Sequence, residues 1–113
     1  MLMFWDDDSA EAPAELEAAQ LTAIRSWVEE MTGRGIRLHG SALGYATEAA
    51  IVRVREGEML VTDGPFAETK EQVGGYDVIE CADLDTAIEV AAAHPLASTA
   101  TVEVRPLQDF PGG

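Results

Sequence analysis

The strongest candidate for acid–base chemistry in this sequence is Asp63, which directly follows the largely apolar run Met59-Leu60-Val61-Thr62. A carboxylate beside apolar groups has its charged form disfavoured, so its pKa can move toward the range needed for proton transfer near neutral pH. The segment Asp63-Gly64-Pro65 is also typical of a turn, in which the carboxylate accepts hydrogen bonds from nearby backbone amides. The sequence therefore leaves two interpretations of Asp63 open, as a catalytic residue or as a turn residue.

His39 is the second candidate for catalysis, because it lies in a predicted strand over residues 36–41, on the same expected face as Arg37 and Ser41. If this face lines a cavity, His39 can approach Asp63 and act with it as an acid–base pair. The alternative is a solvent-facing or core histidine with a single hydrogen bond. His94 precedes Pro95 at a predicted helix end, where a cation complements the helix dipole, so we expect a structural role for it.

Three further residues are candidates for substrate binding. Lys70 can hold an anionic group or lower the pKa of Asp63, or it can form an exposed pair with Glu68. Arg53 faces away from the predicted apolar side of its strand and reaches a pocket, the partner subunit or solvent. Phe66 either walls a pocket or belongs to the core. Each of these alternatives remains open at the level of sequence.

No metal or cofactor is expected. The chain has two histidines on separate predicted elements and one cysteine, without the spacing of a zinc or iron site. Gly74-Gly75 is not a dinucleotide fingerprint, which needs a Gly-rich turn between a strand and a helix. Related folds bind haem, but the sequence gives no positive sign of it. Cys81, at the end of a predicted strand, is expected to be a small buried hydrophobe.

Length and charge restrict the class of protein. The 113 residues predict a single domain over 1–113, and the chain is 47% hydrophobic with a net charge of -14. This charge disfavours contact with phosphate backbones or anionic lipids, so we expect no direct nucleic-acid binding and no membrane association. The apolar run Met1–Trp5 is too short for a signal-peptide core, and a cytoplasmic location is expected.

Hydrophobic periodicity predicts the elements that position these residues. Leu21, Ile24, Val28 and Met31 indicate one apolar face of the first helix, and Leu84, Ala87, Ile88 and Ala91 that of the second. Asp83 is expected to cap the second helix. The predicted elements are strands over 1–5, 36–41, 50–55, 58–62, 76–81 and 101–105, helices over 13–32 and 84–93, and a short helical turn over 67–71. The tail from Pro106 to Gly113 is expected to fray.

The segment from Ala50 to Thr62 predicts a β-hairpin that turns at Glu56-Gly57. Pairing Arg55 with Glu58 puts Val54 opposite Met59 and Val52 opposite Val61 on an apolar face. The same register puts Asp63 opposite Ala50 on that face, at the end of the strand. A carboxylate therefore borders an apolar surface.

The order of elements favours an α+β fold, a ferredoxin-like plait with both helices on one face of an antiparallel sheet. The strands offer apolar groups on both faces. The face without helices therefore needs cover, and a sheet-to-sheet homodimer is the expected solution.

The stretch Val61-Thr-Asp-Gly-Pro-Phe-Ala-Glu-Thr-Lys-Glu-Gln-Val-Gly-Gly-Tyr76 resembles the signature segment of the DGPF proteins, a branch of the YCII-related family. The residues from Ala50 to Arg55 resemble the preceding hairpin of that family. Asp83-Leu-Asp-Thr-Ala-Ile-Glu and Thr101-Val-Glu-Val-Arg-Pro106 resemble its second helix and last strand. The resemblance covers nearly the whole chain and is weakest before Pro13.

The resemblance implies a ferredoxin-like subunit that forms a dimeric α+β barrel. Members of the YCII-related family are suspected enzymes because of a His-Asp pair in a pocket, and Asp63 matches the aspartate. The histidine of that pair lies on the first helix, where this chain has Ala23-Ile-Arg-Ser-Trp27 and no histidine. The pair that the resemblance implies is therefore incomplete in this chain. Genes of the DGPF branch often neighbour those of extracytoplasmic-function sigma factors, which implies a regulatory link.

Two functions are thus expected. The first is a homodimeric protein that binds an unknown small molecule, and that acts as a cofactor-independent lyase or isomerase if Asp63 is an acid or base. The second is a non-catalytic regulatory partner of a sigma factor, which contributes an acidic surface.

Overall fold

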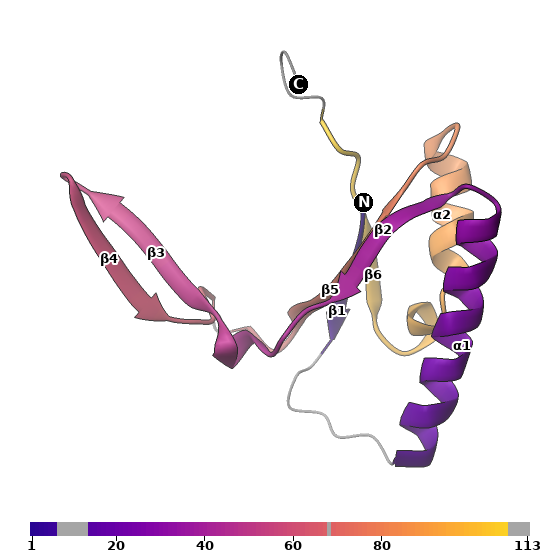
Figure 1. The fold of residues 1–113 in the computed structure, drawn as a ribbon, viewed down its shortest axis with the longest axis horizontal. Helices are drawn as coiled ribbons and strands as arrows, with labels where there is room; N and C mark the ends of the chain where they lie inside the picture. The colour runs from indigo at the N-terminus through magenta and orange to yellow at the C-terminus, as the bar shows by residue number, and fades with distance from the viewer. Residues whose placement is uncertain (7–13, 68, 109–113) are drawn as a thin grey trace.

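The protein is described from a computed structural model, which defines residues 1–6, 14–67 and 69–108. Four antiparallel strands form the main sheet in the order β2-β5-β1-β6, with two helices on one face (Figure 1). The remaining strands, β3 and β4, form a separate two-stranded sheet. The elements in chain order are β1 (Leu2–Asp6), α1 (Ala14–Gly33), β2 (Arg37–Ala42), η1 (Ala46–Glu48), β3 (Ala50–Arg55), β4 (Glu58–Asp63), β5 (Gln72–Ile79), α2 (Leu84–Ala92), η2 (Pro95–Ser98) and β6 (Thr101–Val104).

The main sheet and its helices confirm the predicted α+β, ferredoxin-like fold. Alternate residues of β1 point toward the helices, so Leu2 and Phe4 are buried. Trp27 and Met31, one turn apart on α1, meet them, and the indole N–H of Trp27 donates to the Val90 carbonyl of α2 at 3.1 Å. Val102 and Val104 pair with Phe4 and Leu2, and both pack against this core.

The apolar faces of both helices differ in part from the predicted ones. On α1, Met31 is buried, but Leu21 in the first half of the helix is 53% exposed. On α2, Val90 and Ala91 are buried, whereas Leu84 and Ile88 are exposed. The buried face of α2 is therefore rotated from the predicted stripe toward Val90, whose carbonyl accepts the Trp27 indole N–H.

Both signals for the ends of the second helix are confirmed. The Asp83 carboxylate accepts a hydrogen bond from the Thr86 backbone N–H at 2.8 Å, which satisfies an N–H group that has no partner within the helix. This bond lowers the pKa of Asp83. The helix ends before Pro95, the first residue of η2.

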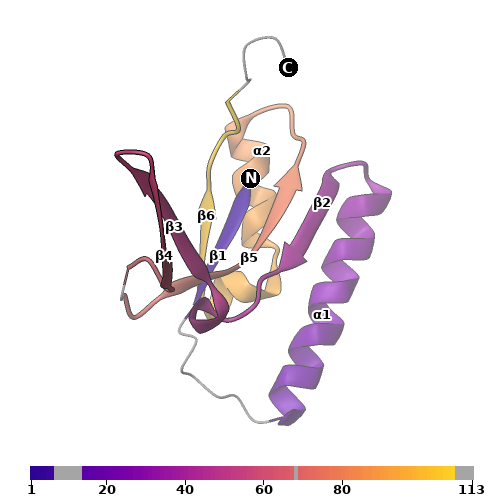
Figure 2. The same cartoon turned by 60° about the vertical axis from the view of Figure 1, so that its left-hand side comes forward.

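The hairpin has the predicted register at every position, with Arg55 opposite Glu58 and Ala50 opposite Asp63. Glu56 and Gly57 both adopt positive φ, at 53° and 79°, as a tight two-residue turn requires. The hairpin does not extend the main sheet. It projects from the side of the sheet opposite the helices, and we call it the arm (residues 50–63; Figures 1 and 2).

Two local predictions are wrong. Instead of a helical turn after Phe66, residues 67, 70 and 71 form bends and residue 69 has no regular structure. A short 3₁₀ helix, η1, lies before the arm. The predicted strand over 76–81 starts earlier, at Gln72, and ends at Ile79, so Cys81 follows the strand. Cys81 is half-buried and packs against the core. Residues 106–108 have no regular structure, whereas Pro13 and residues 109–113 lie outside the described residues.

Within the described ranges, neither helix combines the length and apolar character that crossing a membrane requires.

Candidate functional site

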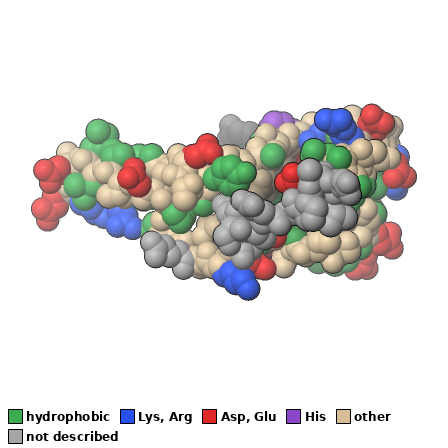
Figure 3. Space-filling view, turned by 90° about the horizontal axis from the view of Figure 1, so that it is seen from below, with side chains coloured by type: hydrophobic (Ala, Val, Ile, Leu, Met, Phe, Trp, Pro, Cys, Tyr) green, Lys and Arg blue, Asp and Glu red, His purple; other side chains and the backbone are tan. Residues whose placement is uncertain are grey.

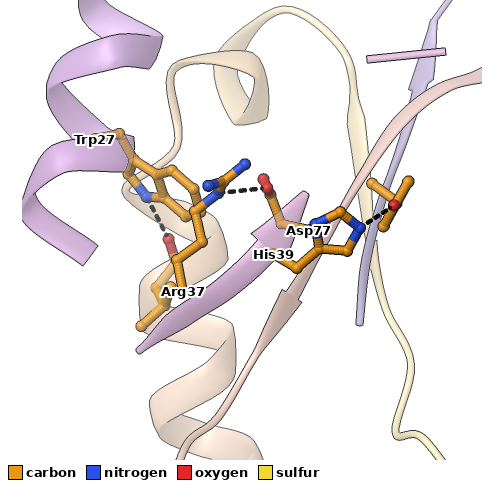
Figure 4. Close-up of polar contacts among 6 residues, drawn as sticks. Trp27, Arg37, His39 and Asp77 are labelled. Carbon is orange, nitrogen blue, oxygen red and sulfur yellow. Dashed lines mark hydrogen bonds and ion pairs between the residues drawn. The ribbon is translucent and has the colours of Figure 1, made fainter. Parts of the chain in front are cut away.

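Strands β2 and β5 carry polar side chains on both faces of the main sheet. Directly paired residues share a face, and Asp77 of β5 pairs with Leu2 on the helix-covered side, whereas Tyr76 pairs with Met3 on the other. Arg37 contacts Asp77, and His39 contacts Tyr76 (Figure 4). The prediction that Arg37 and His39 share a face is therefore wrong. The register shift between these two residues breaks the alternation.

On the helix-covered face, the Arg37 guanidinium donates to the Asp77 carboxylate at 2.7 Å. The two side chains are only 19% and 8% exposed. Burial raises the pKa of Asp77, and the hydrogen bond from Arg37 opposes this effect. The pair lies over Gly40, where a Cβ atom would come within 1.8 Å of the Asp77 Oδ1. The helices cover this pair, so we interpret it as structural.

Neither α1 nor α2 covers the opposite side of the main sheet, and we call it the open face (Figure 2). His39 Nε2 and the Tyr76 hydroxyl are hydrogen bonded at 2.6 Å, with their rings edge to face. The Trp5 indole N–H donates to Glu103 at 3.1 Å, and Glu103 also forms an ion pair with Arg105. The open face is lined by Met3, Trp5, His39, Tyr76, Val78 and Glu103.

Tyr76 is the residue that sequence reasoning missed. Its signal was its place in a strand one residue after Gly74-Gly75, but pairing with β2 could not be deduced from one sequence. The pair offers both a donor and an acceptor, because either ring nitrogen of a neutral histidine can carry the proton. It can therefore hydrogen bond a ligand hydroxyl or carbonyl, or pass a proton through a chain of two groups.

Asp63 occupies the predicted position at the end of the arm, opposite Ala50 and on the same face as Val61 and Met59. Its side chain is exposed, and it forms no hydrogen bond or ion pair with the residues that the structure describes. The next backbone amide, of Gly64, donates to the Ala49 carbonyl at 2.7 Å instead. The carboxylate is therefore available, but nothing in a single subunit encloses it.

The structure does not bring His39 to Asp63. His39 lies in the main sheet and Asp63 in the arm, and within the described part of the chain no hydrogen bond joins them. The third candidate group, Lys70, is exposed and has no ion pair among the described residues, and Glu68 lies outside them.

Two of the predicted binding residues do meet. The Arg53 guanidinium lies over the Phe66 ring, 5.2 Å from its centroid, which is cation–π distance. Phe66 is 72% exposed, so it is not part of the core. This pair lies beside the arm on the face opposite Asp63, because Arg53 alternates with Val52 and Val54.

His94 is structural, as predicted, but it does not act as a cation. It is 4% exposed and packs between Phe4 and Trp27, with ring centroids 4.4 and 4.6 Å away. Its Nδ1 accepts a hydrogen bond from the Leu96 N–H, so the proton of the neutral ring resides on Nε2. Burial lowers its pKa to about 4, and the ring is neutral at pH 7.

Among the described residues, no group of three or more histidine, cysteine, aspartate or glutamate side chains is arranged to hold a metal ion. The polar side chains of the open face and of the arm can form hydrogen bonds and transfer protons.

Sequence comparison relates the chain to known proteins. The chain is 49% identical over 71 residues to an uncharacterized protein from Rhizobium meliloti (strain 1021), a match that covers 59% of this chain and 56% of the relative. The chain thus matches about half the length of that curated relative. The family model described as the YCII-related domain matches residues 1–111. The chain therefore belongs to the YCII-related family.

Proposed function

We propose that the protein is a homodimeric, cytoplasmic small-molecule-binding protein whose ligand lies on the open face. The observation that carries this proposal is the hydrogen-bonded His39–Tyr76 pair on a sheet face that no helix covers. An uncovered sheet face with apolar side chains is a surface that a second copy can bury. A free, half-buried Cys81 suits a reducing compartment.

The composition of the open face matches that of small-molecule sites, which combine apolar walls with a few polar groups of fixed orientation. Met3, Val78 and the Trp5 ring supply apolar surface. The hydrogen bonds that hold Trp5 to Glu103 and His39 to Tyr76 fix the orientation of the polar groups. A ligand therefore meets oriented donors and acceptors rather than freely rotating side chains.

Charge favours a neutral ligand. The chain has a net charge of -14, and Glu103 is a carboxylate on the open face itself. Anionic ligands are repelled by this field, whereas a hydroxylated ring can stack on Trp5 and hydrogen bond to His39 or Tyr76. The ligand class that fits is a small, neutral, partly apolar molecule with one or two hydroxyl groups.

Asp63 is the proposed acid or base if the protein turns its ligand over, as a cofactor-independent lyase or isomerase does. Its support is the position of a carboxylate without a described partner at the end of an apolar strand face. Substitution Asp63→Asn keeps the size of the side chain and removes the acid–base function. An Asp63→Asn variant that binds ligand and reacts as the unchanged protein does would rule out this role.

Binding is tested with Trp5 as the reporter, since Trp27 is 4% exposed and the chain has only these two tryptophans. Catechol serves as the neutral hydroxylated probe and benzoate as the anionic comparison. We expect catechol to change the Trp5 emission in a saturable way and benzoate to have little effect. The Trp5→Phe variant should lose the signal, and the Tyr76→Phe variant should bind more weakly. Equal, non-saturable responses to both probes would refute the proposed site.

A further inference from the structure

We infer that the arm of each subunit clasps a second copy of the chain, and that this contact encloses Asp63. The inference rests on the proposed dimer and adds which surface makes it and which site it completes. In a single subunit, β3 and β4 pack extensively only against each other among the described elements. An isolated two-stranded hairpin is at best marginally stable in water, so the arm needs a contact that its own subunit does not supply.

The dimensions of the chain also indicate that the arm is not packed against its own subunit. Its radius of gyration is 16.5 Å, against about 13 Å for a compact domain of this length. The arm contributes to the excess, because it extends away from the main sheet and its helices (Figure 1). A folded shape with a projecting arm is typical of a chain that completes its packing on another molecule.

The two faces of the arm differ in character. One face carries apolar side chains of high exposure: Val52 60%, Val54 60%, Met59 69% and Val61 57%. The other carries charged and mixed side chains: Ile51, Arg53, Arg55, Glu58, Leu60 and Thr62. Figure 3 shows hydrophobic groups along one side of the arm, basic groups along the other and acidic groups at its tip. The apolar face is the one that gains most from leaving water.

A second copy is the occupant that fits both uncovered surfaces. The arm projects from the same side of the molecule as the open face, so a subunit packed on that face also lies along the arm (Figures 1 and 2). Strands of six residues extend about 20 Å. Four strands spaced about 4.8 Å apart cover roughly 19 Å, so one arm is long enough to cross the partner's sheet.

The distribution of charge also favours contact between the apolar face of the arm and the open face. The chain has 21 acidic and 7 basic residues, and two copies repel each other at most orientations. On the apolar face of the arm the only carboxylate is Asp63, at its base. On the open face, Glu103 is already bonded to Trp5 and paired with Arg105. Contact between the two surfaces therefore brings few uncompensated charges together.

This contact completes a site that one subunit leaves open. Asp63 lies on the apolar face of the arm, in line with Val61 and Met59, so a partner packed on these side chains also shields the carboxylate from water. Loss of water disfavours the charged form of a carboxyl group, which is the condition for acid–base work near neutral pH. The site thus contains groups from both subunits.

The test compares lysine substitutions on the two faces of the arm. Val54→Lys and Val61→Lys alter the apolar face, and Leu60→Lys is the matched control on the opposite face of β4. Sedimentation equilibrium measures the dimer dissociation constant, and circular dichroism checks the fold. We expect each apolar-face variant to raise the dissociation constant about tenfold or more, and Leu60→Lys to change it by less than about threefold.

A second readout follows Asp63 directly. Labelling of carboxylates by a carbodiimide and glycine ethyl ester, located by mass spectrometry, should spare Asp63 in the dimer and modify it in Val61→Lys. Asp83, exposed on the far element α2, should be labelled equally in both and serves as the reference.

The outcomes separate the two proposals. A wild-type protein that stays monomeric at all concentrations overturns the proposed dimer and the clasp with it. A dimer that Val54→Lys, Val61→Lys and Leu60→Lys weaken equally, or not at all, overturns the clasp and leaves the dimer standing. A dimer that the apolar-face variants weaken, but in which Asp63 is labelled throughout, overturns the enclosure of Asp63.

Discussion

The buried histidine of the core gives a quantitative prediction about pH. His94 is 4% exposed, its Nδ1 accepts the Leu96 N–H, and its ring is held between Phe4 and Trp27. Protonation in the folded state places a charge in an apolar contact and removes the acceptor at Nδ1. The unfolded chain has neither restriction, so it binds the proton more readily. Stability should therefore fall as the pH falls through the range in which unfolded histidine is protonated.

The size of the effect follows from the two pKa values. Burial lowers the pKa of His94 from 6.5 to about 4. One pKa unit corresponds to about 1.4 kcal/mol, so the full loss, reached below pH 4, is roughly 3 kcal/mol. Between pH 7 and pH 5 the His94 contribution to the free energy of unfolding should decrease by about 2 kcal/mol. The contribution is fully present above the unfolded pKa and is lost toward the folded one.

Urea denaturation at pH 7 and pH 5, at one protein concentration, measures this difference. The comparison variant is His94→Asn, whose side-chain oxygen can still accept the Leu96 N–H but does not titrate. Asn removes ring packing and is expected to be less stable at both pH values. The informative quantity is therefore the change between the two pH values, in which the acidic groups common to both proteins cancel. If wild type and His94→Asn lose the same free energy between pH 7 and pH 5, the reasoning is refuted.

Three other predictions concern named contacts. Gly40→Ala should lower the free energy of unfolding, measured by urea denaturation, by at least about 2 kcal/mol, because a Cβ there meets Asp77 and the Tyr76 carbonyl. A loss below about 0.5 kcal/mol would contradict this close packing. Arg37→Met should lower the free energy of unfolding by about 3 kcal/mol, because it leaves the buried Asp77 carboxylate without its partner. The double variant Arg37→Met/Asp77→Leu should recover most of this stability. A double variant as unstable as Arg37→Met would contradict the reasoning. Asp83→Ala should lower the thermal midpoint at pH 7, whereas Asp83→Asn should largely preserve it. The stabilisation by Asp83 should be lost only below its ordinary pKa of 3.8, as the carboxylate is protonated. Equal midpoints for wild type and both variants would exclude a capping role.

The parts of the fold that depend on local chemistry were predictable from sequence. The register of the arm follows from a two-residue turn and strict alternation, and every pair from Ala50–Asp63 to Arg55–Glu58 is confirmed. The Asp83 cap is also a local effect.

The parts that depend on tertiary packing were not predictable. A hairpin within the main sheet and a hairpin that projects from it have the same residue pattern, so the sequence did not show that the arm stands apart. The register shift between Arg37 and His39 cannot be recognised from the residue types, yet it places these two side chains on opposite faces of the sheet. The pairing of His39 with Tyr76, 37 positions away, likewise depends on strand order.

The candidate site was predicted in its parts rather than as a unit. Asp63 has the expected position at the end of the apolar strand face, and Arg53 and Phe66 lie together. His39 faces a different surface from the one that Asp63 borders within the same subunit.

The measurement that tests the central claim most directly is acrylamide quenching of tryptophan fluorescence as a function of protein concentration. Trp27 is buried in the core, so the quenchable signal belongs to Trp5 on the open face. If a second copy covers this face, quenching should decrease as the protein passes from monomer to dimer in parallel sedimentation runs. A Trp5 signal that is quenched equally at every concentration, in a protein that does dimerise, would contradict an open face enclosed between two subunits.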